Sequence, residues 1–202
     1  MTQNALSNVS RETIDQLEAF VALIEKWNST INLISKASLP HIWRRHIVDS
    51  AQLFELAPRT GHWVDLGSGG GLPAIVLAIL SKGTGGSHQF TLVESDHRKS
   101  AFLRTSIREL DLQGRVISER IEGVAPLGAD VLSARALADL TTLLGFCAHH
   151  LKPEGTALFP KGQNWKNEHA KAQDNWSYTS HAIKSETDPA AAVLKIQDIK
   201  RV

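Results

Sequence analysis

Apolar side chains recur at helical spacing in the first sixty residues of the chain. Between residues 10 and 27 they stand three or four positions apart, which predicts an amphipathic helix that Ser10 can cap. A second apolar pattern runs from Leu39 to Leu56 and predicts one further helix. We therefore expect residues 1–60 to form a helical segment that packs on a larger domain.

From residue 61 onward, short apolar runs alternate with helical patterns. This alternation indicates an α/β fold with a largely parallel sheet, which we expect residues 61–202 to form. The predicted strands are 63–66, 90–94, 116–119, 129–133, 156–160 and 192–196, and the predicted helices are 73–81, 99–110 and 137–151. The polar residues 163–190 are expected to be rich in loops.

The composition is that of an ordinary globular protein, with 42% hydrophobic and 21% charged residues and a formal net charge of +1. No apolar run reaches the roughly 18 residues that a membrane span needs, and the first residues lack the pattern of a secretory signal. One cysteine, Cys147, excludes an internal disulfide and fits a reducing compartment. We expect a cytoplasmic protein without a membrane partner. A monomer is the expectation, although no feature of the sequence fixes the oligomeric state.

A glycine-rich stretch, DLGSGGGLP at residues 65–73, separates the first predicted strand from the helix that follows. Glycine accepts positive φ and lets a ligand approach the main chain. In a doubly wound sheet, ligands bind beyond the carboxyl ends of the strands, and Glu94 ends the second predicted strand at that same edge. A carboxylate there can accept hydrogen bonds from both hydroxyls of a ribose. The loop and the acid together predict a nucleoside site.

Two nucleoside cofactors compete for this site. A dinucleotide site prefers G-x-G-x-x-G/A, which Gly69, Gly71 and Ala74 match. S-adenosylmethionine has no phosphate and carries two positive groups, which Asp65 in front of the loop would attract. Pro73 also lacks the N–H that would otherwise help to hold a pyrophosphate at the helix terminus. The loop favours S-adenosylmethionine, and an NAD(P)-dependent oxidoreductase remains the alternative.

Several motifs, taken in order, resemble the RsmG/GidB family, bacterial enzymes that use S-adenosylmethionine to methylate guanine N7 in 16S ribosomal RNA. The motifs are KWNSTINLIS (26–35), RRHIVDS (44–50), DLGSGGGLP (65–73), LVESDHRKSAFLR (92–104), ERIEG (119–123), SARALADL (133–140) and LFPKG (158–162). The resemblance implies a class I methyltransferase, with a Rossmann-like, seven-stranded, mostly parallel sheet, helices on both faces and an N-terminal helical extension.

The resemblance also implies a set of cofactor-binding residues. With the glycine loop they are Asp65, Gly67, Gly69, Gly71, Leu72, Glu94, Ile121, Glu122 and Arg135. Glu94 would hold the ribose, Ile121 and Glu122 would border the adenine, and Arg135 would lie near the reacting end.

No side chain is needed as a general base in such a reaction. Guanine N7 carries a lone pair and no proton, so it can attack the methyl group once it is positioned. Carbon-5 methylation needs a nucleophilic cysteine, and Cys147 lies among apolar residues in a predicted helix. The (N/D)PP(Y/F) loop of enzymes that methylate exocyclic amines is absent, because residues 133–136 read SARA. We therefore name no catalytic residue.

Phosphates of 16S ribosomal RNA or of the small ribosomal subunit are expected to contact Arg44, Arg45 and Lys161. We expect His46 and Asp49 to form a buried structural pair. No metal site is expected, because the only histidines near the thiol are adjacent in sequence and lack a fourth ligand. A non-catalytic RNA-binding protein with the same fold remains a second alternative.

Overall fold

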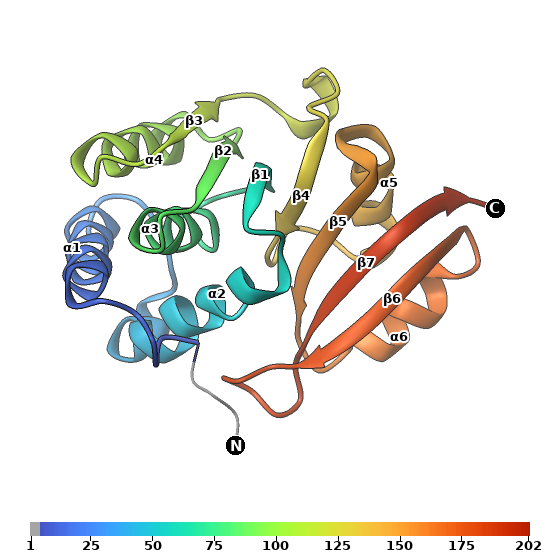
Figure 1. The fold of residues 1–202 in the computed structure, drawn as a ribbon, viewed down its shortest axis with the longest axis horizontal. Coiled ribbons are helices and arrows are strands. Elements are labelled where there is room, and N and C mark those ends of the chain that lie inside the picture. The colour runs from blue at the N-terminus through green and yellow to red at the C-terminus, as the bar shows by residue number, and fades with distance from the viewer. Residues whose placement is uncertain (1–4) are drawn as a thin grey trace.

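Seven strands form one sheet in the computed structural model, which describes residues 5–202 (Figure 1). They are β1 (Thr60–Leu66), β2 (Ser87–Val93), β3 (Gly114–Ile117), β4 (Ala129–Ala134), β5 (Leu151–Lys161), β6 (Trp176–Lys184) and β7 (Ala192–Arg201). Their order across the sheet is β3-β2-β1-β4-β5-β7-β6. β1 to β5 are parallel, and β7 is antiparallel to both of its neighbours. The strand order reverses between β1 and β4, which is where ligand sites lie in such sheets. The predicted fold class is confirmed.

The helices are α1 (Arg11–Asn28), α2 (Asp49–Ala51), α3 (Ala74–Gly83), α4 (His97–Glu109), α5 (Leu140–His150) and α6 (Trp165–Ala172). Four short turns of 3-10 or π type complete the description: η1 (Lys36–His41), η2 (Trp43–Val48), η3 (Phe54–Leu56) and η4 (Ile121–Gly123). Three helices begin after a side chain that accepts a backbone N–H: Ser10 before α1, Asp96 before α4 and Asp139 before α5.

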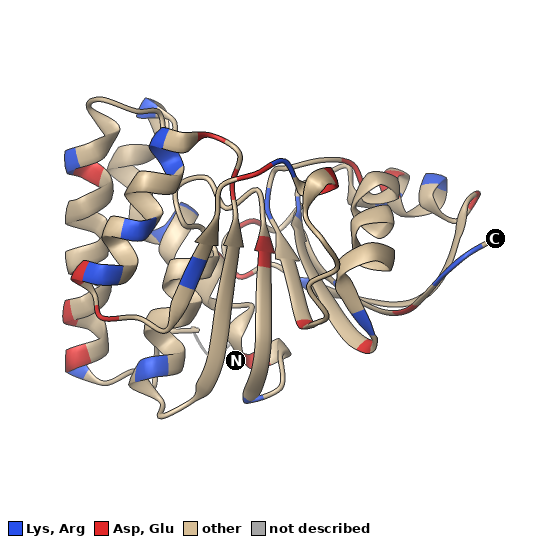
Figure 2. Ribbon diagram, turned by 90° about the horizontal axis from the view of Figure 1, so that it is seen from above, with Lys and Arg blue, Asp and Glu red and all other residues tan. Residues whose placement is uncertain are grey.

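Both faces of the sheet are buried under helices. Trp63 on β1 belongs to a core cluster shared with α1, α3 and α4, whereas its neighbour Val64 belongs to a second cluster shared with α5 and α6. Central strands buried on both faces read as short apolar runs, which is why they could be located from sequence. The charged residues lie mainly on the surrounding helices and loops, with both signs interspersed (Figure 2).

The N-terminal helical part shares the first core cluster with the sheet. On α1, Leu17, Phe20 and Ile24 are fully buried, and the Phe20 ring stacks on Phe102 of α4 with 6.3 Å between centroids. The described part of the first sixty residues is therefore helical and packed on the sheet. The boundary at residue 60 stays a prediction.

The prediction of one helix from Leu39 to Leu56 was wrong. The segment consists of η1, the π-helix η2, a single turn of α2, and η3. Pro40 lies inside η1 and has no N–H to donate to an α-helical ladder, and π turns commonly mark functional sites. η2 contains the RRHIV part of the RRHIVDS motif, so the π-helical backbone includes the predicted RNA-binding residues Arg44 and Arg45.

The expectation that residues 163–190 are rich in loops was also wrong. They contain α6 and β6, and the terminal strand β7 extends to Arg201. β6 is the edge strand and most of its side chains are exposed or half-buried, while α6 buries only Ala172 completely. Elements that bury so little surface leave a weak hydrophobic signal in the sequence.

Candidate functional site

Two cavities meet at the carboxyl edge of the parallel strands. The smaller one, of about 420 Å³, lies over the ends of β1, β2 and β3 and is called here the small cavity. The larger one, of about 950 Å³, is bordered by η2, the loop after β4 and the β6–β7 loop, and is called the groove. Ala136 and Ala138 line both, so the loop after β4 forms their common wall. Both volumes lie within the range of small-molecule sites, roughly 300–1,000 Å³.

Glycines shape the floor of the small cavity for different reasons. Gly67 has a φ of +64°, and a Cβ there would stand 2.6 Å from Cδ1 of Leu137. Gly69 has a φ of +52°, and a Cβ there would meet nothing closer than the Gly67 carbonyl oxygen at 3.8 Å. The first glycine is required by packing, whereas the second leaves open space and bare main chain that a ligand can approach.

Glu94 closes the small cavity at the end of β2. Its Oε2 accepts the backbone N–H of Gly69 at 2.8 Å, and its Oε1 accepts the N–H of Asp96 at 2.8 Å. The residue is only 8% exposed. Each carboxylate oxygen keeps further acceptor capacity, so hydroxyl donors can still bind on the cavity side.

Asp65 lies beneath the glycine loop and is 1% exposed. Ser133 donates its hydroxyl to Oδ1 at 2.6 Å, while Oδ2 is buried without a hydrogen-bond partner among the described residues. Burial raises the pKa of Asp65 to about 6, against the effect of the Ser133 hydrogen bond and of the Arg135 charge. Asp65 is thus a buried ionisable group with an unsatisfied acceptor near the end of β1, directly before the glycine loop in sequence.

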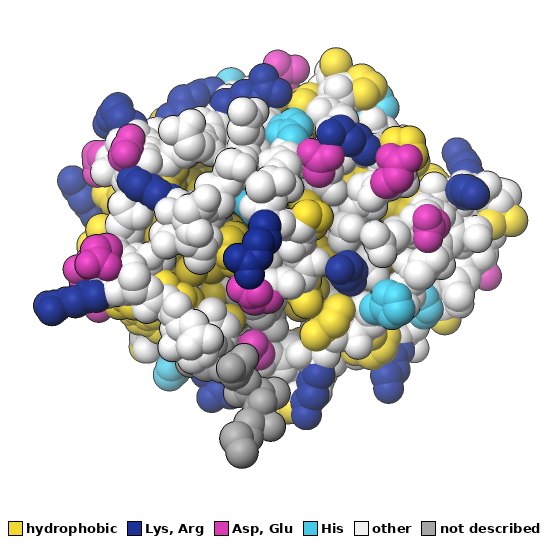
Figure 3. Space-filling model, in the orientation of Figure 1, with side chains coloured by type: hydrophobic (Ala, Val, Ile, Leu, Met, Phe, Trp, Pro, Cys, Tyr) yellow, Lys and Arg dark blue, Asp and Glu magenta, His cyan; other side chains and the backbone are white. Residues whose placement is uncertain are grey.

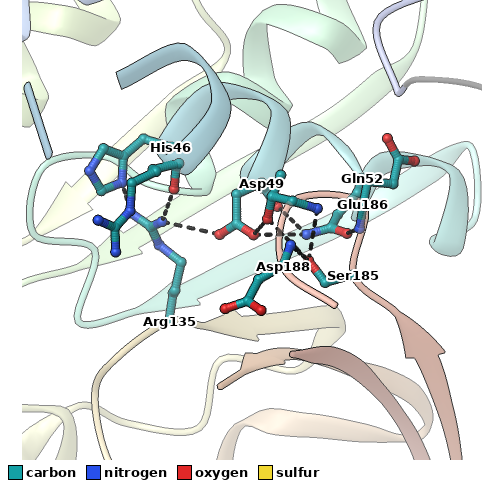
Figure 4. Close-up of polar contacts among 9 residues, drawn as sticks. His46, Asp49, Gln52, Arg135, Ser185, Glu186 and Asp188 are labelled. Carbon is teal, nitrogen blue, oxygen red and sulfur yellow. Dashed lines mark hydrogen bonds and ion pairs between the residues drawn. The ribbon is translucent and has the colours of Figure 1, made fainter. Parts of the chain in front are cut away.

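Arg135 connects the loop after β4 to the helical segment (Figure 4). One guanidinium nitrogen contacts Oδ2 of Asp49 at 3.2 Å and the Arg45 carbonyl at 3.3 Å, and the other lies 3.1 Å from Nδ1 of His46. Arginine only donates, so Nδ1 accepts and the proton of neutral His46 resides on Nε2. Burial, with the charges of Arg135 and Arg45, lowers the pKa of His46 to about 4.

The predicted pair of His46 and Asp49 therefore takes a different form. Both side chains contact Arg135, and the structure shows no direct hydrogen bond between them within residues 5–202. The Arg135 guanidinium lies between the two side chains and contacts each of them.

The predicted RNA-binding residues all line the groove, but they differ in exposure. Arg44 and Arg45 are exposed, and Arg44 donates to the Thr187 carbonyl at 3.3 Å. The Lys161 side chain is only 9% exposed, and its ammonium contacts Oε2 of Glu168 and the Ala138 carbonyl, each at 2.7 Å. Lys161 thus has partners within the chain. Lys and Arg side chains gather along the upper edge of the face in Figure 3. Away from the groove, Arg98, Arg104 and Arg108 of α4 and Arg115 of β3 are exposed.

The structure brings together a part of the predicted cofactor set. Gly67, Gly69, Glu94, Ile121 and Glu122 line the small cavity. Arg135 lines the groove, while Asp65, Gly71 and Leu72 are buried and line neither cavity. Their roles in binding stay predictions.

Several residues that line the small cavity were not predicted from the sequence, among them Leu137, Thr142 and Phe146. Thr142 and Phe146 stand four positions apart on α5, so they share one helical face, and this spacing was the available signal. Leu137 is 36% exposed, an unusual value for a large apolar side chain in this structure.

Two absences bear on the site. None of the helices within residues 5–202 has the length and apolar character needed to cross a bilayer. Across the same residues, no group of three or more His, Cys, Asp or Glu side chains could hold a metal ion.

The family model and the curated relatives that match this chain carry the same description. The family model GidB, described as rRNA small subunit methyltransferase G, matches residues 13–192. A curated relative from Ruegeria pomeroyi, named ribosomal RNA small subunit methyltransferase G, is 55% identical over 195 residues, which cover 96% of both chains. A relative of the same name from Rhodospirillum centenum is 46% identical and covers 96% of this chain and 88% of its own.

Solved structures share the fold at low sequence identity. An S-adenosylmethionine-dependent methyltransferase of putative function from Methanococcus maripaludis superposes with a TM-score of 0.57 at 14% identity, covering 88% of this chain and 91% of its own. A ribosomal protein L11 methylase from Lactobacillus delbrueckii subsp. bulgaricus gives 0.59 at 18% identity, covering 76% and 78%. These likenesses concern the fold alone.

Proposed function

Because the chain belongs to the GidB family of small-subunit rRNA methyltransferases, we propose that it transfers the methyl group of S-adenosylmethionine to N7 of a guanine in 16S ribosomal RNA. The observation that carries this proposal is the meeting of the small cavity and the groove at Ala136 and Ala138. A methyl donor on one side of this wall and an RNA base on the other can be brought into line. Family membership sets aside the dinucleotide oxidoreductase and the non-catalytic RNA-binding protein.

The residues of the small cavity fit S-adenosylmethionine, which when bound supplies an electrophilic methyl group on a positively charged sulfur. The open main chain at Gly69 leaves room beside the loop, and the fixed carboxylate of Glu94 accepts from ribose hydroxyls. Ile121 and Phe146 offer apolar walls for a purine. The unsatisfied Oδ2 of Asp65 provides negative potential below the loop when it is ionised.

The reaction requires the protein to position the methyl donor and the base, and it requires no proton acceptor. Guanine N7 presents a lone pair and carries no proton, so nothing has to be removed as the new bond forms. His46, the imidazole beside the guanidinium in the groove, is neutral at physiological pH because its pKa is depressed. The contribution of the chain is to hold the two reactants in line and to exclude water.

The groove supplies the RNA side of the site. Arg44 and Arg45 present exposed guanidinium groups that can neutralise backbone phosphates. Arg135 lies on the groove side of the common wall, so we assign it to a phosphate of the bound RNA and not to the transferring methyl group.

A ribosomal RNA substrate and a single buried thiol, Cys147, support a cytoplasmic location, and we expect the enzyme to act as a monomer.

The deciding experiment is a methyl-transfer assay with labelled S-adenosylmethionine on 16S rRNA, and on small subunits, from a strain that lacks the gene. Nuclease digestion and mass spectrometry should find the label as 7-methylguanosine at one position. Label on another base atom, or no label with either substrate, would contradict the proposal. Calorimetric titration with NAD(H) serves as the control, and no binding is expected.

A further inference from the structure

One carboxylate ties together three segments that border the groove. Oδ2 of Asp49 accepts from Arg135 at 3.2 Å, and its Oδ1 accepts from the Thr187 hydroxyl at 2.8 Å and from the Gln52 amide at 3.0 Å (Figure 4). These contacts link α2 to the loop after β4 and to the β6–β7 loop. Glu186 adds a second tie, because its N–H donates to the Gln52 side chain at 3.1 Å.

Within the described residues, Arg135 forms an ion pair with Asp49 and with no other side chain. The Arg45 carbonyl is neutral, and His46 is uncharged because its pKa is depressed. The side chains of Arg135 and Asp49 are each 18% exposed, so water screens their attraction less than that of a surface pair. Asp49 therefore provides the direct charged contact of the guanidinium, while the buried Asp65 interacts with it at longer range.

The position of this guanidinium matters because of the backbone beside it. Ala136 follows Arg135 directly, holds a φ of +53° and lines both cavities. A non-glycine residue in this conformation persists only where its surroundings impose it. The contacts of Arg135 with the helical segment are one such constraint, placed at the wall across which the methyl group has to pass.

We propose that Asp49 is a positioning residue: it holds Arg135 at the boundary of the two cavities and fixes the β6–β7 loop, so that the groove is shaped before RNA binds. This inference rests on the proposed function. Asp49 lines the groove and not the small cavity, so its effect falls on the RNA-dependent step. Binding of S-adenosylmethionine should not depend on it.

The test compares Asp49→Asn with a matched surface change, Asp111→Asn. The Asp111 carboxylate pairs with Lys82 at 3.1 Å, and its side chain is 91% exposed. In Asp49→Asn we expect kcat for methyl transfer to 16S rRNA to fall by about 10- to 100-fold, the cost of a small misplacement at a reacting site. The KM for S-adenosylmethionine should stay within about twofold of wild type, and Asp111→Asn should leave both values unchanged.

A double-mutant cycle separates positioning from a general loss of structure. If Asp49 acts through Arg135, combining Asp49→Asn with Arg135→Gln should cost no more than the worse single change. Fully additive losses would overturn the inference. Thr187→Val removes the hydroxyl that contacts Asp49 and Ser185 within the loop, but it leaves the ion pair with Arg135 in place. It should cost less than Asp49→Asn, and an equal cost would also overturn the inference, because loop docking alone would then explain the effect.

Two further outcomes distinguish a failure of this inference from a failure of the proposed function. Wild-type protein that transfers no methyl group to rRNA refutes the function. Active wild type together with an Asp49→Asn variant within twofold of its kcat refutes the role of Asp49 alone. If Asp49→Asn does not fold, Asp49→Glu replaces it, since it keeps the charge but moves the carboxylate, and a lowered kcat with unchanged cofactor KM is again expected.

Discussion

The backbone N–H of Gly69 donates a 2.8 Å hydrogen bond to Oε2 of Glu94, between residues 25 positions apart that follow neighbouring parallel strands. The other carboxylate oxygen of Glu94 accepts the N–H of Asp96. Both oxygens are therefore oriented before any ligand arrives. The contact joins the glycine loop and the acidic residue, which the sequence had predicted to act together.

Gly69→Val should abolish binding of S-adenosylmethionine while the protein still folds. A branched side chain would enter the open space beside the loop, and the left-handed backbone at φ +52° would add about 1–2 kcal/mol of strain. Calorimetric titration with the cofactor measures the first effect and thermal unfolding the second. Gly85→Val is the matched control, because Gly85 has a φ of +68° and no atom within 4 Å of its Cβ position. Equal affinity losses in both variants would refute the loop assignment.

Glu94→Gln should weaken cofactor binding at least about tenfold. Glutamine places an amide N–H₂ where one carboxylate oxygen accepts, and hydrogen bonds to charged groups contribute about 1.5–3 kcal/mol each. Glu119→Gln makes the same change in the same cavity at an exposed side chain outside the predicted cofactor set and should alter affinity much less. If the two variants bind the cofactor equally well, Glu94 does not hold the ribose.

Asp65→Asn should remove a pH dependence of stability. The folded protein keeps a proton on Asp65 up to a pKa of about 6, whereas the unfolded chain releases it near 3.8. The free energy of unfolding of the wild type therefore falls as pH rises from about 4 to about 6 and then stays lower. The difference of about 2 pH units corresponds to about 3 kcal/mol.

Denaturant unfolding of wild type and Asp65→Asn at pH 3.5 to 7.5 measures this contribution. Subtracting the two curves cancels the titration of all other groups, so the advantage of the variant should grow by about 3 kcal/mol across that window. A difference that does not change with pH would show that Asp65 is ionised in the fold at its ordinary pKa.

Arg45→Gln should weaken RNA binding at every sequence and lower the salt dependence. Arg45 is exposed in the groove, and a guanidinium that neutralises one phosphate contributes about 1 to the slope of log affinity against log salt. Filter binding or fluorescence anisotropy with a 16S rRNA fragment, at several salt concentrations, gives the slope. An unchanged slope would remove Arg45 from the RNA contact surface.

Lys161→Gln should act mainly on stability. The Lys161 side chain is 9% exposed, and its ammonium contacts Glu168 and the Ala138 carbonyl. The change therefore leaves a partly buried carboxylate without its cation, at a cost of about 3 kcal/mol. Denaturant unfolding should show this loss while the salt slope of RNA binding stays that of wild type. A slope lowered by about 1 with normal stability would instead support the sequence prediction that Lys161 contacts RNA.

The contacts of Asp49 with distant segments could not be predicted from the sequence. His46 and Asp49 were expected to form a buried structural pair, yet both contact Arg135, which lies 86 positions beyond Asp49. Thr187 reaches the same carboxylate from 138 positions away. A separation in sequence contains no information about such distances, because they depend on how the helical segment and the β6–β7 loop pack on the sheet.

The sequence by itself determined the alternation of strands and helices, the cap of α1 by Ser10, and the loop and acid that open the small cavity. These features follow from short-range chemistry: the period of apolar side chains, the freedom of glycine backbone, and the parallel strands that place two strand ends at one edge. Only the tertiary structure decided that α2 adjoins a π-helix, that edge strand β6 exists, and that Asp49 contacts Arg135. Each of these depends on contacts between distant segments, whose free energy arises only once the core has packed.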